Sequence, residues 1–263
     1  MPACVIALAD AEGPFFSERG DAFPTATPEQ WRAADTFDPG AVTDRGRWWL
    51  QFRAFAIRTG ERVILVDAGI GPADSPAAAW APVPGRLPER LAAAGIDRGE
   101  VDTVVLTHLH TDHVGWAVVS DEDSLRPYFP DARYVLQRTE LEAIEELNPS
   151  LRESLIEPLQ AEDRLELTDG GRDLAAGVRA IHTPGHTPGH QSVLAETDSG
   201  TTAVTGDVLV HAIQLLHPEL PYTQESDPEA ARRTRIELLD SLARADGTLA
   251  TPHLTGPFVP ARI

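Results

Sequence analysis

The chain has 263 residues, enough for one large domain or two small ones. Apolar residues make up 42% and charged residues 24% of it, as in a globular protein with a substantial core. Its 41 acidic and 22 basic residues give a net charge of −19, which repels phosphate backbones and argues against nucleic acid as a partner. Every basic residue is arginine, which excludes lysine Schiff-base chemistry. The single cysteine, Cys4, excludes an internal disulfide and a multi-thiolate metal site.

Targeting signals are not evident. No apolar run approaches the roughly 18–20 residues of a membrane span. The N-terminal segment has a short apolar run with no basic residue before it, unlike a signal peptide. We therefore expect a cytoplasmic protein without a membrane partner.

The pattern of apolar residues predicts interleaved strands and helices. Residues 1–47 are expected to form an irregular arm, because residues 10–47 are rich in Pro, Gly, Asp and Thr. Strands are then predicted at 48–59, 61–71, 101–113, 133–137 and 248–251, with four shorter ones between 164 and 207. Helices are predicted at 85–96, 138–148, 150–160 and 227–245. This alternation indicates an α/β layered fold, and a single domain over 1–263 is the simplest interpretation.

The strongest functional signal is THLHTDH at 107–113. Four residues of metal-ligand type, His108, His110, Asp112 and His113, directly follow an apolar strand. His108 and His110 are two apart, so in an extended chain their imidazoles point to the same side and can hold one metal ion. Asp112 and His113 diverge and can face a second ion. Imidazole and carboxylate ligands without thiolate suit Zn, and also Fe, Mn, Co or Ni.

Three later segments offer further ligands. In HTPGHTPGH at 182–190, glycines and prolines form rigid turns, and spacing alone does not choose among His182, His186 and His190 as a ligand. Asp207 lies just beyond another strand, where a carboxylate can bridge two cations or cap the next helix. His253 follows the last strand beside Pro252.

Taken in order, THLHTDHVGW, TPGHTPGH, TGD and the late histidine resemble the metallo-β-lactamase superfamily over about residues 50–255. The resemblance implies a four-layer αβ/βα sandwich with two metal ions at one edge of the paired sheets. It implies that one ion is held by His108, His110 and His186, that the other is held by Asp112, His113 and His253, and that Asp207 bridges them. His182 and His190 then become supporting residues, and Asp67 orients a ligand imidazole.

This ligand set implies a dinuclear metal-dependent hydrolase. Two divalent ions about 3.5–4 Å apart, with Zn expected first, would share a hydroxide that attacks a small ester or lactone. Asp112 is the catalytic candidate, because its carboxylate can orient the hydroxide or pass a proton to the leaving group. We expect a small-molecule substrate, and a homodimer if the apolar arm forms an interface.

Other branches of the family remain as alternatives. A β-lactam hydrolase is disfavoured, since one zinc-dependent type has cysteine in place of Asp207 and another lacks the bridging aspartate. A glyoxalase II-like thioesterase shares the ligands but binds an anionic tail through basic residues, and we interpret Arg232, Arg233 and Arg235 as the solvent face of a helix. A mononuclear iron dioxygenase or other redox protein would use fewer ligands.

The segments DHVGW and TPGHTPGHQS most resemble the lactonase and methyl parathion hydrolase-like branch. N-acyl-homoserine lactonases carry a catalytic tyrosine three residues after the bridging aspartate, where this chain has Val210. The difference favours an apolar pocket, with phosphotriesters as a side activity. Candidate pocket residues are Phe15, Phe16, Trp116, Leu209, Val210 and Leu216.

Overall fold

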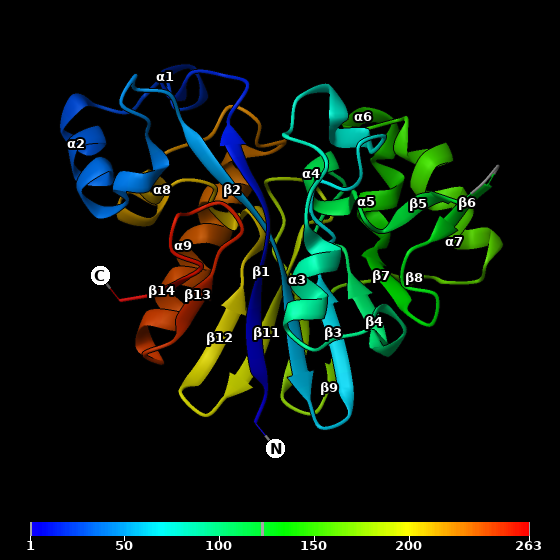
Figure 1. The fold of residues 1–263 in the computed structure, drawn as a ribbon. Helices are drawn as coiled ribbons and strands as arrows, with labels where there is room; N and C mark the ends of the chain where they lie inside the picture. The colour runs from blue at the N-terminus through cyan, green and yellow to red at the C-terminus, as the bar shows by residue number, and fades with distance from the viewer. Residues whose placement is uncertain (1, 122–123, 263) are drawn as a thin grey trace.

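The protein is built on two sheets that pack face to face. The computed structural model describes residues 2–121 and 124–262. The first sheet has the order β1-β2-β3-β4-β7-β8 and the second β14-β13-β12-β11-β10-β9. Helices cover the outer face of each sheet, which gives four layers (Figure 1). The predicted αβ/βα sandwich is therefore confirmed.

The strands and helices have the following bounds. The strands are β1 (Cys4–Pro14), β2 (Trp49–Thr59), β3 (Arg62–Val66), β4 (Thr103–Val105), β5 (Val118–Asp121), β6 (Ser124–Pro127), β7 (Arg133–Gln137), β8 (Leu165–Thr168), β9 (Arg172–Ala175), β10 (Val178–His182), β11 (Gln191–Thr197), β12 (Gly200–Val204), β13 (Thr248–Ala250) and β14 (Phe258–Pro260). The helices are α1 (Arg19–Ala22), α2 (Pro28–Phe37), α3 (Leu87–Ala93), α4 (Thr111–Val114), α5 (Arg138–Glu142), α6 (Ile144–Leu147), α7 (Glu157–Ala161), α8 (Ala212–Leu216) and α9 (Pro228–Arg244).

Apolar burial holds the layers together. The space between the sheets is filled by Phe55, Ile57, Ile64, Val66, Val105 and Val135 from the first sheet and by Val178, Val193, Ala195, Val204 and Ala250 from the second. On the outer faces, Leu87 and Leu91 of α3 pack on the first sheet, and Leu238 and Leu242 of α9 pack on the second. Each buried aliphatic side chain of this kind contributes about 1.5–3 kcal/mol, so the sandwich rests on matched apolar faces.

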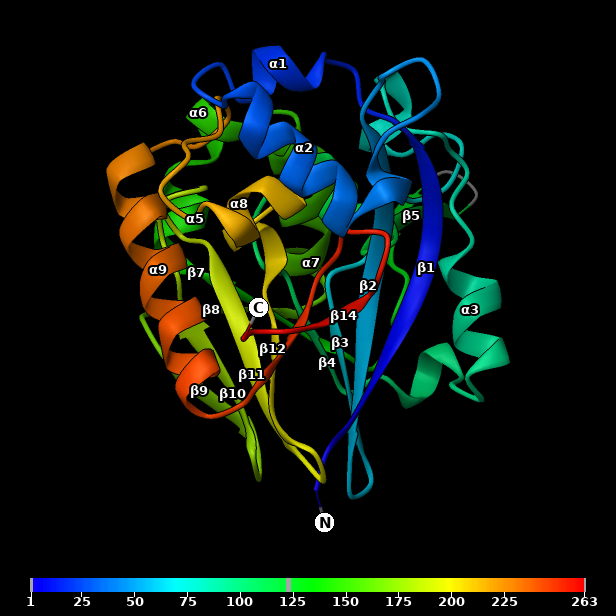
Figure 2. The ribbon, with the colours of Figure 1, turned by 90° about the vertical axis from the view of Figure 1, so that its left-hand side faces the viewer.

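The direction of the strands positions the functional loops. Strands β3, β4, β7 and β8 run parallel, and so do β12 and β13. Strand β10 is antiparallel to β11, which is antiparallel to β12, so β10 and β12 run in the same direction. The loops that follow β4, β10, β12 and β13 therefore gather at one edge of the sandwich. Figure 2 shows α2 and α8 side by side above this edge.

The expected irregular arm over residues 1–47 is wrong in two places. Strand β1 pairs along the whole of β2, from Cys4 opposite Arg58 to Pro14 opposite Trp49. A register shift at Asp10 interrupts the alternation of β1, which is why the pattern did not predict a strand. Helix α2 begins with a capping box formed by Thr27 and Gln30, a signal that the composition of the segment obscured.

Two predicted helices also differ in detail. The segment 138–148 divides at Ala143 into α5 and α6, and the segment near 150–160 begins as a π-helical stretch, Arg152–Ile156, that continues into α7. The division turns the chain so that Glu140 and Asn148 both reach the loop after β4, where Leu109 lies. Among the described residues, no helix combines the length and apolar character that a bilayer crossing requires.

The interpretation of Arg235 as a solvent-facing residue is wrong. Its side chain is fully buried beneath α9, whereas Arg232 and Arg233 are exposed. The guanidinium donates to Glu225 Oε1 at 2.8 Å and to the carbonyl oxygens of Val208 and Leu220 at 2.9 and 3.0 Å. One buried ion pair thus fastens the segment after Asp207 to α9.

We expect Arg235→Ala to lower the free energy of unfolding by about 3–5 kcal/mol, because it leaves the Glu225 carboxylate buried without a cation. Arg232→Ala on the same helix is the matched control and should stay within about 0.5 kcal/mol of the wild type. Urea unfolding followed by circular dichroism measures both. Equal stability of the two variants would contradict the role given to the buried pair.

Candidate metal centre

Four loops bring the ligand-type side chains to one place. The segment after β4, a loop that continues into α4, carries His108, His110, Asp112 and His113, and the loops after β10, β12 and β13 carry His186, Asp207 and His253. Their ligand atoms fall into two groups, within each of which all lie within 4.8 Å of one another. The first group is His108, His110, His186 and Asp207, and the second is Asp112, His113 and His253.

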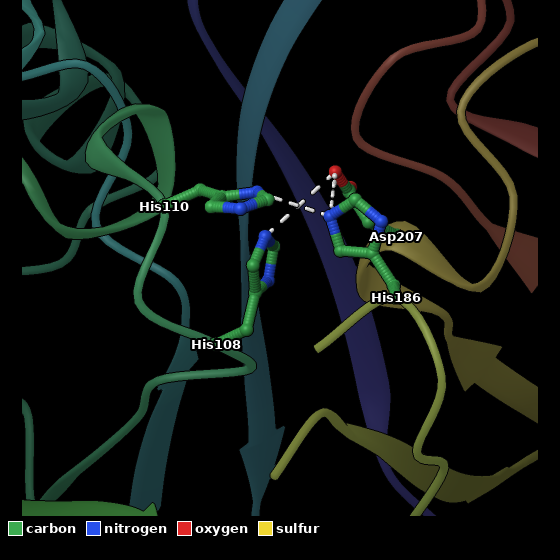
Figure 3. A group of neighbouring side chains, drawn as sticks. All are labelled: His108, His110, His186 and Asp207. Atoms are coloured by element: carbon green, nitrogen blue, oxygen red, sulfur yellow. Dashed lines mark hydrogen bonds and ion pairs between the residues drawn. The ribbon is translucent and has the colours of Figure 1, made fainter. Parts of the chain in front are cut away.

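The side chains of the first group point toward a common centre (Figure 3). Asp207 Oδ2 lies 3.8 Å from His108 Nε2 and 3.3 Å from His186 Nε2. His186 Nε2 lies 3.0 Å from His110 Nδ1. His108 and His110 follow a strand of the first sheet, whereas His186 and Asp207 follow strands of the second, so the group forms only when both sheets are packed.

Asp207 also faces the second group with its other oxygen. Its Oδ1 lies 3.4 Å from His113 Nε2 and 3.2 Å from His253 Nε2. Asp112 Oδ2 lies 3.5 Å from His113 Nε2 and 3.6 Å from His253 Nε2. One carboxylate therefore stands between the two groups with one oxygen directed to each.

The donor set fits divalent metal ions. Ligand atoms about 2.0–2.2 Å from a tetrahedral ion are separated from one another by roughly 3.3–3.6 Å. The separations given above, from 3.0 to 3.8 Å, lie around that range. His108 Nε2, His113 Nε2 and Asp207 Oδ1 are buried without a hydrogen-bond partner among the described residues. Buried polar atoms normally have partners, so these atoms are arranged for a ligand that is not part of the chain.

The electrostatic environment shifts the pKa values of the imidazoles in opposite directions. Burial, reinforced by neighbouring imidazoles, holds the pKa of His108 and His186 well below its ordinary value, so both are neutral with a free lone pair. Burial also lowers the pKa of His113, but Asp207, Asp112 and Asp67 outweigh it and raise that pKa well above the ordinary range. Three carboxylates therefore favour positive charge at His113, and a bound cation would take the place of the proton on its imidazole.

Further contacts orient the ligands. Asp67 Oδ2 accepts a hydrogen bond from His113 Nδ1 at 2.8 Å, and its Oδ1 accepts one from the Thr107 backbone N–H at 2.8 Å. His190 Nε2 accepts one from the Asp207 N–H at 2.9 Å. His253 Nδ1 donates to the carbonyl oxygen of Gln51 at 2.8 Å, which leaves Nε2 toward the carboxylates. Each of these bonds fixes a tautomer or a side-chain direction.

His182 does not take part in this arrangement. The three histidines of the 182–190 segment were equivalent candidates in the sequence, and only His186 joins a ligand group. The side chain of His182 is exposed and its Nε2 lies 3.0 Å from the carbonyl oxygen of Pro188. It lines a separate groove beside α9.

A cavity of about 260 Å³ opens above the two groups. Its floor includes His110, Asp112, His186, Asp207 and His253. Its walls are Phe15, Phe16, Trp48, Leu50, Trp80, Leu147, Val210 and Tyr222, with Thr111, Asn148 and Gln224 as the polar residues. Among these described lining residues none is an arginine, so the cavity offers aromatic surface and carboxylates but no fixed cation.

Three of the expected pocket residues lie elsewhere. Trp116 points away from the cavity. Its Nε1 donates to Asp10 Oδ1 at 3.2 Å, and its ring packs on Tyr128. Leu209 is in extended backbone next to Val210, so the two side chains point to opposite sides, and Leu209 is buried beneath α9. Leu216 ends α8 on the side that faces α2.

Several residues of the site had no sequence signal. Tyr222 and Gln224 belong to an irregular segment before α9, and Trp80 lies in an alanine- and proline-rich loop. The ring of Tyr222 stacks on His186 with centroids 6.1 Å apart and an interplanar angle of 6°. An aromatic residue in a loop is consistent with a pocket wall, but the pattern does not indicate which loop reaches the site.

Paired sheets that hold two imidazole–carboxylate groups at one edge define a metallo-hydrolase type of fold. The model of the metallo-β-lactamase superfamily matches residues 47–246. The chain therefore belongs to the metallo-β-lactamase superfamily, which confirms the resemblance of its motifs.

Curated relatives agree with this assignment. An N-acyl homoserine lactonase from Bacillus sp is 28% identical over 186 residues, which is 65% of this chain and 67% of that protein. An N-acyl homoserine lactonase from Bacillus thuringiensis is 29% identical over 147 residues, 56% of this chain and 53% of that protein. The matched segments thus span about half to two thirds of these relatives. Together with the site, they support a metal-dependent hydrolase.

Two solved structures have the same fold. A hydrolase of the β-lactamase superfamily, AbOPH, matches with a TM-score of 0.78 and 27% identity over 97% of this chain and 88% of that one. The dizinc quorum-quenching lactonase AidC, solved with a product bound, matches with a TM-score of 0.73 and 20% identity over 97% and 88%. The second likeness is one of fold alone.

The position of Asp207 predicts how zinc stoichiometry responds to substitution. We expect the wild type to bind one ion for each of the two ligand groups, His253→Ala to lose one, and Asp207→Ala to lose both or bind both weakly. Equilibrium dialysis followed by elemental analysis measures the ratio. His182→Ala is the control and should retain both ions; loss of metal from that variant, or full occupancy in Asp207→Ala, would refute the assignment.

Proposed function

We propose that this protein is a dinuclear metal-dependent hydrolase that acts on a small, neutral ester or lactone. The observation that carries the proposal is the carboxylate of Asp207, which faces both ligand groups at the floor of an aromatic cavity. Two divalent ions held there, which we propose to be zinc, would polarise a carbonyl oxygen and lower the pKa of an attacking water. Phosphotriesters are a proposed side activity.

The lining of the cavity supports a neutral substrate. Phe15, Trp48 and Trp80 supply apolar surface, while Asp112 and Asp207 supply negative charge. Away from the proposed metal ions, a carboxylate or phosphate tail of a substrate would lose hydration against these walls without gaining an ion pair with a side chain. Small size follows from the volume of about 260 Å³, which is near the lower end for small-molecule sites.

This lining disfavours a thioesterase of the glyoxalase II type. Such an enzyme needs basic residues for the anionic tail, yet Arg232 and Arg233 are exposed on α9 and Arg235 is buried in its pair with Glu225. A fungal relative, the atrochrysone carboxyl ACP thioesterase of Passalora fulva, is 29% identical over 66% of this chain but over only 41% of its own length. We therefore rank thioester hydrolysis second.

We assign proton transfer to one side chain of the cavity and hydrogen-bond donation to another. Asp112 lines the cavity and lies 3.6 Å from His253, so its carboxylate can accept a proton from water and deliver it to the leaving group. Tyr222 is buried, and burial together with the charges of Asp207 and Asp112 raises the pKa of its phenol well above the ordinary value. The phenol therefore stays protonated at neutral pH and can donate a hydrogen bond to the reacting oxygen.

A panel of neutral lactones, esters, thioesters and phosphotriesters tests the reaction class with the zinc-loaded protein. We expect turnover of the lactones or esters, and Asp112→Asn should lower kcat by about 10²–10⁴-fold because the amide cannot accept a proton. Metal content is measured in parallel, so that loss of an ion is distinguished from loss of the base. The proposal fails if wild type and variant are equally inert on the panel.

Tyr222→Phe tests the proposed hydrogen-bond donor. The variant keeps the ring that stacks on His186 and removes only the hydroxyl. We expect kcat to fall by about 10²-fold while zinc content stays unchanged. Trp80→Phe, which changes another residue of the cavity wall, should alter KM more than kcat. A kcat for Tyr222→Phe equal to that of the wild type would exclude the phenol from the reaction.

A further inference from the structure

We propose that Glu140 is a positioning residue that sets the metal affinity of the first ligand group, by tying the loop of His108 and His110 to the loop of His186. Its carboxylate touches no ligand side chain and has no place in the reaction outlined above. The inference rests on the metal-binding part of the proposed function, and it does not depend on which substrate is hydrolysed.

The contacts of Glu140 join two loops that come from different sheets. Oε1 accepts the backbone N–H of Leu109 at 2.8 Å, and Leu109 stands between His108 and His110. Oε2 accepts the N–H of Gly189 at 2.8 Å, in the loop that carries His186. One rigid carboxylate therefore spans the gap between the loop after β4 and the loop after β10.

The environment of Glu140 indicates a specific role for the charge. The side chain is fully buried, and among the described residues no cation pairs with it. Burial raises the pKa of the carboxyl group, and the Leu109 N–H, the Thr187 hydroxyl and the Gly189 N–H counteract this. An unpaired buried carboxylate is costly, so an apolar residue would serve packing better at this position. The carboxylate instead provides two hydrogen-bond acceptors at a fixed separation, one for each of the two backbone N–H groups.

Two neighbouring features strengthen the link that Glu140 makes between Leu109 and Gly189. Asn148 Nδ2 donates to the carbonyl oxygen of Leu109 at 2.8 Å, so both polar groups of that residue's backbone are held by the α5–α6 segment. A Cβ at Gly189 would lie 2.3 Å from the backbone nitrogen of Glu140, so only glycine allows the second loop to approach this closely. The break at Ala143 places Glu140 and Asn148 on either side of the same backbone unit.

The second ligand group is held by other contacts. His113 is oriented by Asp67, and His253 donates to the carbonyl oxygen of Gln51. Neither contact passes through Glu140. Loss of the Glu140 hydrogen bonds should therefore weaken binding at the first ligand group (His108, His110 and His186) more than binding at the second (Asp112, His113 and His253).

Glu140→Gln is the direct test, because glutamine keeps the size but turns an NH₂ group toward one of the two N–H donors. Zinc affinities are measured by competition with a chelating dye. We expect one of the two ions to bind about 10–100-fold more weakly in the variant, with the other unchanged. The matched control is Asp10→Asn: Asp10 is equally buried and accepts the N–H groups of Ile70, Leu87 and the Trp116 indole, but it contacts neither Leu109 nor Gly189.

Asn148→Leu provides a second variant if Glu140→Gln does not fold, since Asn148 is only partly buried and holds the other side of Leu109. It should weaken the same ion. Wild-type affinity for both ions in a folded Glu140→Gln or Asn148→Leu protein, or an equal loss in Asp10→Asn, would overturn the inference. Failure of the wild type to hydrolyse any substrate, with two zinc ions bound, would refute the proposed reaction and leave this inference standing.

Discussion

The carboxylate of Asp207 is the constraint on which the site depends. Its two oxygens face two groups of side chains, and the groups are drawn from both sheets. Because its burial is offset mainly by His113 and His253, the pKa of Asp207 lies well below the ordinary value and the group stays ionised. A buried anion needs positive charge beside it, which protonated imidazoles or bound metal ions can supply, and this requirement links the packing of the sheets to the chemistry at their edge.

The loops that carry the ligands are held by polar contacts rather than by regular secondary structure. Asp67 holds Thr107 and His113, and Arg53 donates from β2 to the carbonyl oxygens of Pro252 and Thr255 at 3.3 and 2.6 Å on either side of His253. Each loop thus has a buried charged residue of its own. Such contacts replace the hydrogen bonds that loop backbone cannot make with a strand, and they fix imidazoles to the accuracy that a metal site needs.

The sequence predicted the strands with continuous apolar runs, the α/β layering and the residues that gather in the two ligand groups, because periodicity and ligand spacing are local properties. It failed for β1, whose alternation is interrupted at Asp10, and for Arg235, whose partner Glu225 lies ten residues away. The walls of the cavity were predicted only in part. Val210 lines it while Leu209 does not, a distinction that depends on backbone direction after Asp207.

The floor of the cavity follows from local sequence patterns and the walls do not, and this difference bears on substrate choice. The floor consists of ligand-type residues, and all of them except His253 lie within residues 47–246, the segment that the family model matches. Part of the walls comes from Phe15 and Phe16, which precede that segment, and part from Trp80 and Tyr222, which lie in irregular loops. Loops accept substitution more readily than the buried strands that aim the ligands. A chain of this fold can therefore keep its metal-binding floor and change its substrate through the loops, and under the proposed function the aromatic walls would determine the substrate specificity of this protein.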